Sequence, residues 1–289
     1  MVEPGLGELG LARHLKISVE SPHTAHQQVA MRRVHFIELH DQSWFPRFLR
    51  NDVTDALQYG LNFSKAYPPI APLLQSALDS AGNPPIVDLC SGGGGPWLDL
   101  GRRLRGDAAK FHVSLTDKYP NPAAFGNAQS RSGIAIRFYG GSVDATDVPA
   151  ELSGFRTMFT SFHHFPFAEA QAIIQNAVDA GQGIGIFEIT SRTPSAILLV
   201  ALWSLTPFLF TPFLRPFRWS RFIFTYVLPV IPLVLLFDGI VSCLRTYQPV
   251  ELREMIKNLR APRYQWHVGE LRGEAVRIPV TYLIGYPAG

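Results

Sequence analysis

Residues 86–104 hold the feature that most constrains the fold: an apolar run, IVDLC, then SGGGG, then a helical pattern beginning near Pro96. Glycines directly after a strand let the backbone turn tightly and approach a ligand closely. A P-loop would carry Lys and then Ser or Thr after the last glycine, but Pro96 and Trp97 stand there. Trp97 also occupies the place of the small residue that a dinucleotide fingerprint needs for close packing of helix and strand. The remaining ligand class is a nucleoside without a pyrophosphate, with an ammonium group held by Asp88.

Apolar runs alternate with helical stretches along the middle of the chain. Five short runs have the length and composition of strands. They lie at 85–90, 111–117, 134–141, 155–162 and 183–190. This alternation is typical of βαβ units that form a parallel sheet. Two more runs, 263–271 and 278–286, are close enough in sequence to form an antiparallel hairpin at a sheet edge. The sequence therefore predicts an α/β fold with a seven-stranded, mostly parallel sheet and a C-terminal antiparallel hairpin.

An aspartate stands at or just beyond the end of each of the first three predicted strands. Asp88 ends the first, Asp117 ends the second, and Asp144 lies just beyond the third. A carboxylate in the second position can accept hydrogen bonds from two ribose hydroxyls, and one near an adenine amine can accept its N–H. With an ammonium group at Asp88, these pairings fit S-adenosylmethionine. Aspartate also caps helices well, so capping is the alternative role for each of the three.

The same residues resemble the motifs of Rossmann-like class I S-adenosylmethionine-dependent methyltransferases. That family reads roughly D-x-G-x-G-x-G at the first turn. Here Asp88, Gly92 and Gly94 match this pattern, and Cys90 replaces the first glycine. The segments VDATDVP and MFTSFHHFP match two later motifs of the family, in the same order along the chain.

The resemblance covers residues 80–190 and, more loosely, 245–289, and it implies S-adenosylmethionine as the cofactor. It implies that the methionine moiety lies against Asp88, Ser91, Gly92, Gly93 and Gly94, the ribose against Asp117, and the adenine against Asp144 and Ala145. The expected reaction is methyl transfer to a small, lipophilic acceptor. One alternative is an NAD(P)-linked oxidoreductase, which Trp97 disfavours. The other is a non-catalytic, membrane-associated protein that keeps the fold.

Two neighbouring histidines are the candidate catalytic residues. His163 and His164 end the fourth predicted strand, and in open α/β sheets ligands bind outside the carboxyl ends of the strands. An imidazole there can act as a general base on an acceptor, although either ring can instead be a packed structural side chain. Arg245 and Tyr247 precede the last predicted helix and are candidates for binding an anionic or phenolic acceptor. A surface arginine and a packed tyrosine are the alternative.

Residues 194–237 form a long apolar insertion in which Arg215, Arg218 and Arg221 separate two uncharged runs. Both ends of the insertion join one domain, so a spanning hairpin would carry these arginines across the membrane, against the positive-inside tendency. We expect the hairpin to lie on or dip into one leaflet, with the arginines at the phosphate headgroups. The alternative is a lid on the catalytic domain that forms an apolar pocket.

These patterns divide the chain into four parts. They are an N-terminal helical cap at 1–80, a cofactor-binding core at 81–193, the apolar insertion at 194–240, and the rest of the core at 241–289. The cap is expected to be helical from about residue 28, after a frayed N-terminus.

The composition excludes several other classes of protein. Only two cysteines are present, which excludes a disulfide framework and a multi-cysteine zinc module, and we predict no metal site. The formal charge of +3, without a long basic run, argues against a nucleic-acid partner. The N-terminus has no apolar core of the signal-peptide type, so we expect a cytoplasmic protein that can associate with a membrane through 194–237.

Overall fold

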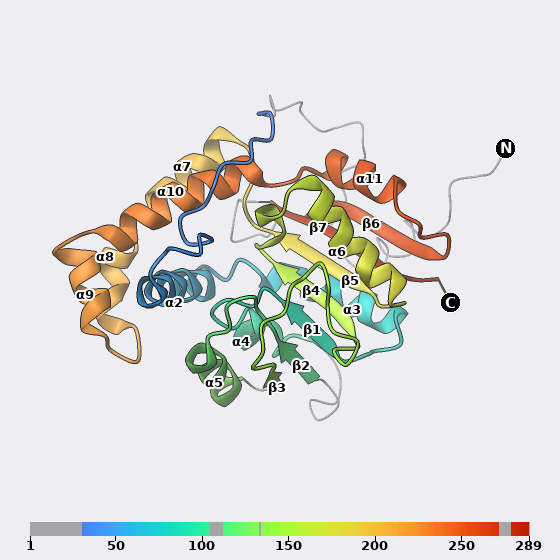
Figure 1. The fold of residues 1–289 in the computed structure, drawn as a ribbon, viewed down its shortest axis with the longest axis horizontal. Helices are drawn as coiled ribbons and strands as arrows, with labels where there is room; N and C mark the ends of the chain where they lie inside the picture. The colour runs from blue at the N-terminus through green and yellow to red at the C-terminus, as the bar shows by residue number, and fades with distance from the viewer. Residues whose placement is uncertain (1–30, 105–111, 133, 272–278, 289) are drawn as a thin grey trace.

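The structure is a computed structural model that describes residues 31–104, 112–132, 134–271 and 279–288. Seven strands form one sheet (Figure 1). The strands are β1 Ile86–Leu89, β2 His112–Leu115, β3 Ala135–Phe138, β4 Phe155–Phe159, β5 Ile184–Glu188, β6 Tyr264–Leu271 and β7 Val280–Pro287. The expected frayed N-terminus lies outside the described residues.

The strand order across the sheet is β3-β2-β1-β4-β5-β7-β6. Strands β1 to β5 are parallel, with Asp88 of β1 opposite Thr157 of β4 and Leu115 of β2. Strand β7 runs antiparallel to β5, and β6 pairs antiparallel with β7 at the edge. The predicted Rossmann-like α/β sheet with a C-terminal antiparallel hairpin is confirmed, and the second strand of the hairpin is the inner one.

Helices cover both faces of the sheet, because buried side chains along each strand alternate between the two faces. The helices of one face are α3 Ala71–Ser80, α4 Trp97–Leu100 and α5 Pro122–Arg131, and those of the other are α6 Phe167–Asp179 and α11 Pro249–Lys257. In β1, Ile86 belongs to the core of the first face and Val87 to the core of the second. Two cores therefore hold the sheet rigid beneath the turns that follow its strands.

The N-terminal cap differs from the expected run of short helices. Residues 31–46 are irregular, and one helix, α2 Arg47–Ser64, follows Pro46; a short 3-10 turn, η1 Pro68–Ile70, precedes α3. In Figure 1 the irregular segment runs along the insertion toward α2. The backbone N–H groups of Leu39 and His40 donate to the carboxylate of Asp238 at 2.7 and 3.1 Å. This distant acceptor takes the place of helical hydrogen bonds. The prediction of helix from about residue 28 is therefore wrong for residues 31–46.

The apolar insertion is a helical arm that extends from the sheet (Figure 1). Its elements are α7 Pro194–Trp203, α8 Pro207–Phe210, η3 Thr211–Phe213, α9 Trp219–Tyr226 and α10 Val230–Arg245. The predicted boundary at residue 240 falls inside α10, which continues into the core. Side chains of α10, including Ile231 and Val234, pack with Leu49 and Val53 of α2 in a third apolar core.

Arginines of the insertion hold it to α2. Arg221 is 1% exposed and its guanidinium lies 2.5 Å from the carboxylate of Asp55, and Arg218 lies 3.4 Å from that of Asp52. The expectation that all three arginines face lipid headgroups is therefore wrong for Arg221, because its charge is neutralised inside the protein. Arg215 is exposed.

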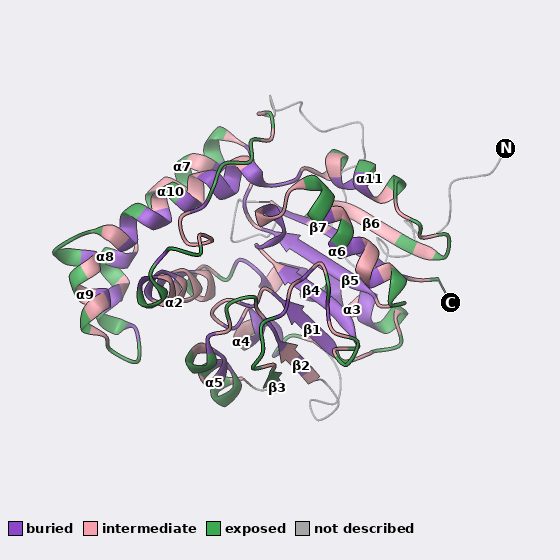
Figure 2. Ribbon diagram, viewed as in Figure 1, coloured by how far each residue is buried: buried purple, intermediate pink, exposed green. Residues whose placement is uncertain are grey.

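Large apolar side chains remain exposed along α7, α8 and α9. Figure 2 marks exposed positions along this arm. In the described part of the chain, one helical stretch, Pro194–Phe213, has the length and composition to cross a membrane, with a mean hydropathy of 1.9 and 22% of its most apolar window buried. Helices α9 and α10 pass the same test together, bent by 73° at their junction. Core helices of soluble proteins also pass this test, but they are mostly buried.

Candidate functional site

The glycine turn after β1 has the left-handed backbone that its sequence predicts. Gly92 has φ 52° and Gly94 has φ 111°. Cys90, which stands where the class I methyltransferases have their first glycine, has φ 56°. A non-glycine residue in this region costs roughly 1–2 kcal/mol. Cys90 therefore adopts, with some strain, the left-handed conformation that favours glycine.

Asp88 lies beneath this turn and is 1% exposed. Its carboxylate accepts hydrogen bonds from the hydroxyls of Ser91 and Thr157, both at 2.7 Å. Burial raises the pKa of Asp88 to about 6, against the opposing effect of these hydrogen bonds. Ser91 is also buried and spans the turn, because its N–H donates to the carbonyl of Thr116. A buried carboxylate held by hydroxyls is suited to pairing with a ligand cation at the strand end.

Asp117 lies just beyond β2 and connects that strand to the glycine turn. One carboxylate oxygen accepts the N–H of Gly92 at 2.8 Å, and the other accepts the N–H of Tyr119 at 2.8 Å. Each oxygen keeps a further lone pair, and the residue is partly exposed. Its side chain is thus fixed in place while remaining able to accept hydrogen bonds from two hydroxyls.

Asp144 lies beyond β3, where its side chain is 45% exposed. It accepts hydrogen bonds from the backbone N–H of Thr146 at 2.9 Å and from its hydroxyl at 2.7 Å, and Lys118 lies 3.3 Å away. The hydrogen bonds from Thr146 come first in lowering the pKa of Asp144. Ala145 is buried behind it.

The three predicted cofactor carboxylates lie around the glycine turn. Ser91 and Gly92 of the turn bond to Asp88 and Asp117, and the N–H of Val143, next to Asp144, donates to the carbonyl of Asp117 at 3.0 Å. The pKa of Cys90 is raised well above its usual value, first by burial and then by the charges of Asp117, Asp88, Asp41 and Asp144. Helix α2 closes one side of this turn, where the side-chain amide of Gln58 donates to the carbonyl of Gly95 at 2.8 Å. The carboxyl ends of the first three strands thus form one acidic site, in which oxygen acceptors suit the ammonium, ribose and amine groups of an adenosyl amino acid.

His163 lies in the turn η2 Phe162–His164 after β4 and is 1% exposed. Its Nδ1 lies 2.7 Å from the carboxylate of Glu188, which also accepts the backbone N–H of Phe162 at 2.7 Å. An ionised carboxylate only accepts, so Nδ1 carries the hydrogen. Burial opposes ionisation of Glu188, but its interaction with His163 and these hydrogen bonds outweigh burial and lower the pKa of Glu188. Nε2 of His163 has no hydrogen-bond partner among the described residues.

His164 points toward the N-terminal cap. Its Nδ1 lies 2.7 Å from the carboxylate of Asp41 and 3.4 Å from that of Glu38. Burial would lower the pKa of His164, but these two carboxylates outweigh it and raise the pKa to about 9. His164 is therefore a cation near neutral pH, so of the two histidines only His163 has the arrangement of a general base.

Arg245 and Tyr247, the predicted acceptor-binding residues, are buried and bonded within the protein. The guanidinium of Arg245 lies 3.2 Å from Glu38 and 3.4 Å from Asp41, and it donates to the carbonyls of His163 and His164. The hydroxyl of Tyr247 donates to the carbonyl of Phe165 at 2.8 Å. Both residues hold the histidine turn in place, and contact with an acceptor stays a prediction.

Sequence reasoning missed the acidic partners of the histidines. Glu188 lies within the apolar run GIGIFEIT, and an acid inside a buried apolar run is a usable signal that it has a polar partner. Glu38, His40 and Asp41 lie in the segment FIELHD. Its apolar spacing suggested a helix, so the contacts of these polar side chains with the histidines were not predicted.

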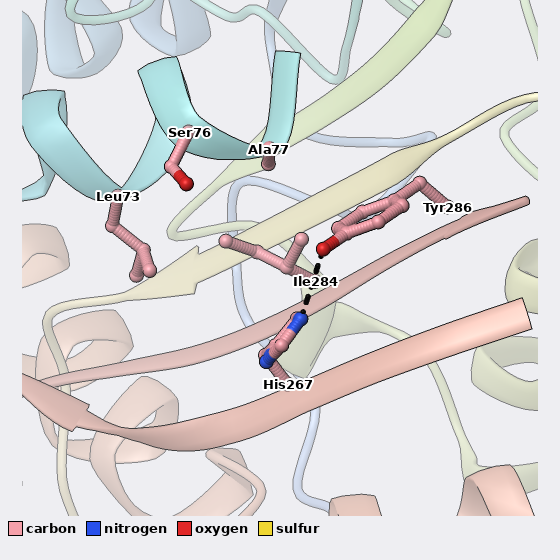
Figure 3. Close-up of a pocket in the computed structure, with 6 residues that line it drawn as sticks. All are labelled: Leu73, Ser76, Ala77, His267, Ile284 and Tyr286. Atoms are coloured by element: carbon pink, nitrogen blue, oxygen red, sulfur yellow. Dashed lines mark hydrogen bonds between the residues drawn. The ribbon is translucent and has the colours of Figure 1, made fainter. Parts of the chain in front are cut away.

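A small hollow lies apart from this site, between α3 and the β6–β7 pair. It is lined by Leu73, Ser76, Ala77, His267, Ile284 and Tyr286 (Figure 3). It has room for roughly one water molecule. This hollow is too small for a nucleoside, and none of its six lining residues belongs to the acidic site.

Comparisons with known proteins identify the fold. No family model matches the sequence, and neither does any curated protein sequence. Among solved structures, the chain is similar to the plantazolicin methyltransferase BpumL in complex with SAH, with a TM-score of 0.55, 10% identity, and coverage of 86% of this chain and 94% of that one. The fold is therefore that of the class I S-adenosylmethionine-dependent methyltransferases, as the resemblance predicted.

Two further solved structures show weaker similarity. An O-methyltransferase family protein from Burkholderia thailandensis has a TM-score of 0.45 at 15% identity, with coverage of 81% of this chain and 60% of that one. Human N-acetylserotonin methyltransferase in complex with SAM has a TM-score of 0.45 at 13% identity, with coverage of 81% and 56%. The chain thus spans little more than half the length of these two proteins.

Proposed function

We propose that this protein transfers a methyl group from S-adenosylmethionine to a small acceptor. The observation that carries the proposal is that Asp88, Asp117 and Asp144 lie around the glycine turn, at the carboxyl ends of three adjacent strands. Asp88 and Asp117 accept hydrogen bonds from Ser91 and Gly92 of the turn. The N–H of Val143, next to Asp144, donates to the carbonyl of Asp117. The similarity to a methyltransferase solved with SAH supports it at the level of the fold. In an α/β sheet of this kind, ligands bind at that edge.

The chain's own residues suit each part of the cofactor. Asp88, fixed by Ser91, would neutralise the ammonium group from below the glycine turn, where Gly92, Gly93 and Gly94 allow close approach. Asp117 would accept the ribose hydroxyls. Asp144, with Ala145 behind it, would accept the adenine amine.

When bound, S-adenosylmethionine supplies a methyl group on a positively charged sulfur. His163 is the residue that we assign as general base. Its Nδ1–H is held by Glu188, so Nε2 carries the free lone pair. Held by Asp88, Asp117 and Asp144, S-adenosylmethionine would give this methyl group to the acceptor and leave as S-adenosylhomocysteine. A proton on the acceptor's nucleophilic atom would pass to Nε2, and Glu188 would stabilise the resulting imidazolium.

We infer that the acceptor is lipophilic and that the protein works in the cytoplasm at a membrane surface. Support comes from the arm at 194–237, which exposes Leu202, Phe213 and Trp219 by more than half of their surface. Contiguous apolar surface of this kind marks a protein or membrane contact. The exposed Arg215 is available to an anionic headgroup beside these side chains.

The test is a calorimetric titration of the full chain with S-adenosylhomocysteine, with NADPH titrated in parallel. Saturable binding of S-adenosylhomocysteine alone is the expected result. Binding of NADPH alone would favour the oxidoreductase alternative. Binding of neither, together with flotation on liposomes, would favour a non-catalytic membrane protein.

A further inference from the structure

Four potential metal ligands meet between the N-terminal cap and the turn after β4. They are Glu38, His40 and Asp41 from the irregular segment and His164 from η2, and one ligand atom from each lies within 4.8 Å of all the others. Two imidazoles and two carboxylates are a donor set that proteins use for zinc and related ions.

One carboxylate oxygen of Glu38 is buried without a hydrogen bond. Glu38 is 1% exposed, and its Oε1 lies 3.2 Å from Arg245. Its Oε2 accepts no hydrogen bond within the described part of the chain, yet it lies 3.4 Å from Nδ1 of His164 and 3.9 Å from Nδ1 of His40. A buried carboxylate oxygen without a hydrogen-bond partner is costly, and a cation beside it would remove that cost.

The ring of His40 is already held in the state that a metal needs. Its Nδ1 lies 3.0 Å from the carboxylate of Asp238, so Nδ1 carries the hydrogen and Nε2 keeps its lone pair. Nε2 lies 3.9 Å from Oδ1 of Asp41, on the side of the cluster. A carboxylate behind a histidine in this way fixes the tautomer of metal-binding imidazoles.

The charges leave room for a divalent cation. Glu38, Asp41 and Asp238 bring three negative charges, and Arg245 brings one positive charge. A metal would displace the proton of His164, and with both histidines neutral the cluster then has two negative charges in excess.

We propose that Glu38, His40, Asp41 and His164 bind a divalent first-row transition-metal ion, for which Zn²⁺ is the probe. Ligand atoms at ~2.1 Å from zinc in a tetrahedron lie ~3.4 Å apart, so small side-chain rotations close the present arrangement around the ion. Mg²⁺ and Ca²⁺ prefer oxygen ligands alone and are not expected to bind. The proposal departs from the expectation of no metal site, which the cysteine count suggested, because these ligands include no cysteine.

The ion would join the N-terminal cap to the histidine turn. All four ligands come from the protein, which is typical of structural rather than catalytic zinc sites. Nε2 of His163 lies 3.6 Å from Oε1 of Glu38, so the ion would fix the carboxylate that faces the proposed base. Metal binding is measured without cofactor or acceptor, so its failure is distinct from failure of methyl transfer.

The experiment treats the full chain with a chelator, removes the chelator, and titrates the protein with Zn²⁺ by calorimetry, followed by Co²⁺ with visible spectroscopy. Expected are a single saturable site, ligand-field absorption typical of four-coordinate Co²⁺, and a higher melting temperature with Zn²⁺. His40→Gln and Asp41→Asn, both at partly exposed positions, should each lose at least tenfold in affinity.

Two matched variants serve as controls. Glu254→Gln on α11 removes an exposed carboxylate and His267→Gln on β6 removes a remote imidazole, and neither should change Zn²⁺ affinity. Circular dichroism of each apo variant establishes that it is folded. The proposal is overturned if the wild-type chain binds no Zn²⁺, or if His40→Gln and Asp41→Asn bind it as tightly as the controls do.

Discussion

Glu188 at the end of β5 holds Nδ1 of His163 at 2.7 Å, although the two residues are 25 positions apart in sequence. The same carboxylate accepts the backbone N–H of Phe162, so it fixes both the ring and the turn that carries it. One carboxylate therefore sets the tautomer of the imidazole and directs its free nitrogen away from β5.

The pairing of His163 with Glu188 predicts how substitutions at these two residues change the rate of methyl transfer. His163→Ala should lower the rate of methyl transfer by about 10²–10⁴-fold, the usual contribution of a general base. Glu188→Gln should also lower the rate, because an amide can stabilise the wrong tautomer. Affinity for S-adenosylhomocysteine should stay unchanged in both. Turnover and calorimetry measure the two effects, with His267→Gln as the control; a His163→Ala variant of full activity would exclude the assigned base.

Asp117 predicts a second, separable effect, on cofactor affinity. Asp117→Ala removes the predicted acceptor of the ribose hydroxyls and also frees the N–H groups of Gly92 and Tyr119. A hydrogen bond to a charged group contributes ~1.5–3 kcal/mol, so affinity for S-adenosylhomocysteine should fall by at least about tenfold. Asp79→Ala, on the exposed end of α3, is the matched control. Unchanged binding by Asp117→Ala would count against the adenosyl site itself.

Because the pKa of Asp88 is raised, we expect the stability of the fold and the affinity for the cofactor to change in opposite directions with pH. Burial raises its pKa from 3.8 to about 6. The folded state thus holds the proton more tightly than the unfolded state. The contribution of Asp88 to the free energy of unfolding is greatest below about pH 4 and decreases, by up to about 3 kcal/mol, as the pH rises through 6. Cofactor affinity should increase over the same window, since the ammonium group pairs with the ionised carboxylate.

Asp88→Asn is the test of that dependence. Relative to wild type, it should flatten the change in melting temperature between about pH 4 and pH 7 and weaken cofactor binding at pH 7. Asp147→Asn, exposed beyond β3, is the control. A wild-type affinity that is the same at pH 5 and pH 7 would contradict the proposed role of the ionised Asp88.

Removing the buried arginine of the insertion is expected to destabilise the protein. Arg221 is buried against Asp55 and Asp52, and removing one member of a buried ion pair costs ~3–5 kcal/mol. Arg221→Ala should therefore lower the melting temperature clearly, whereas Arg215→Ala, at an exposed position, should not. Equal melting curves for the two variants would mean that the insertion is not held to α2 in this way.

The elements that the sequence predicts well are those whose signal is local. The strand before Cys90 and the glycines after it carry their own pattern, so both the sheet and the turn could be predicted. The segment 31–46 could not, because its backbone hydrogen bonds depend on Asp238, 199 residues from Leu39. The partner of Arg221 was missed for the same reason, since Asp55 lies 166 residues earlier. Contacts between distant segments leave no periodic pattern in sequence.

The exposed arm predicts binding to membranes. Leu202, Phe213 and Trp219 are exposed by 57, 66 and 70%, and burying one such side chain in an apolar medium contributes ~1.5–3 kcal/mol. A Leu202→Ser, Phe213→Ser double variant should therefore lose most of its flotation with liposomes of anionic lipid. Phe167→Ser on α6, 41% exposed but outside the arm, should float as wild type does. A wild-type chain that stays unbound would instead favour the arm as a lid over the acceptor.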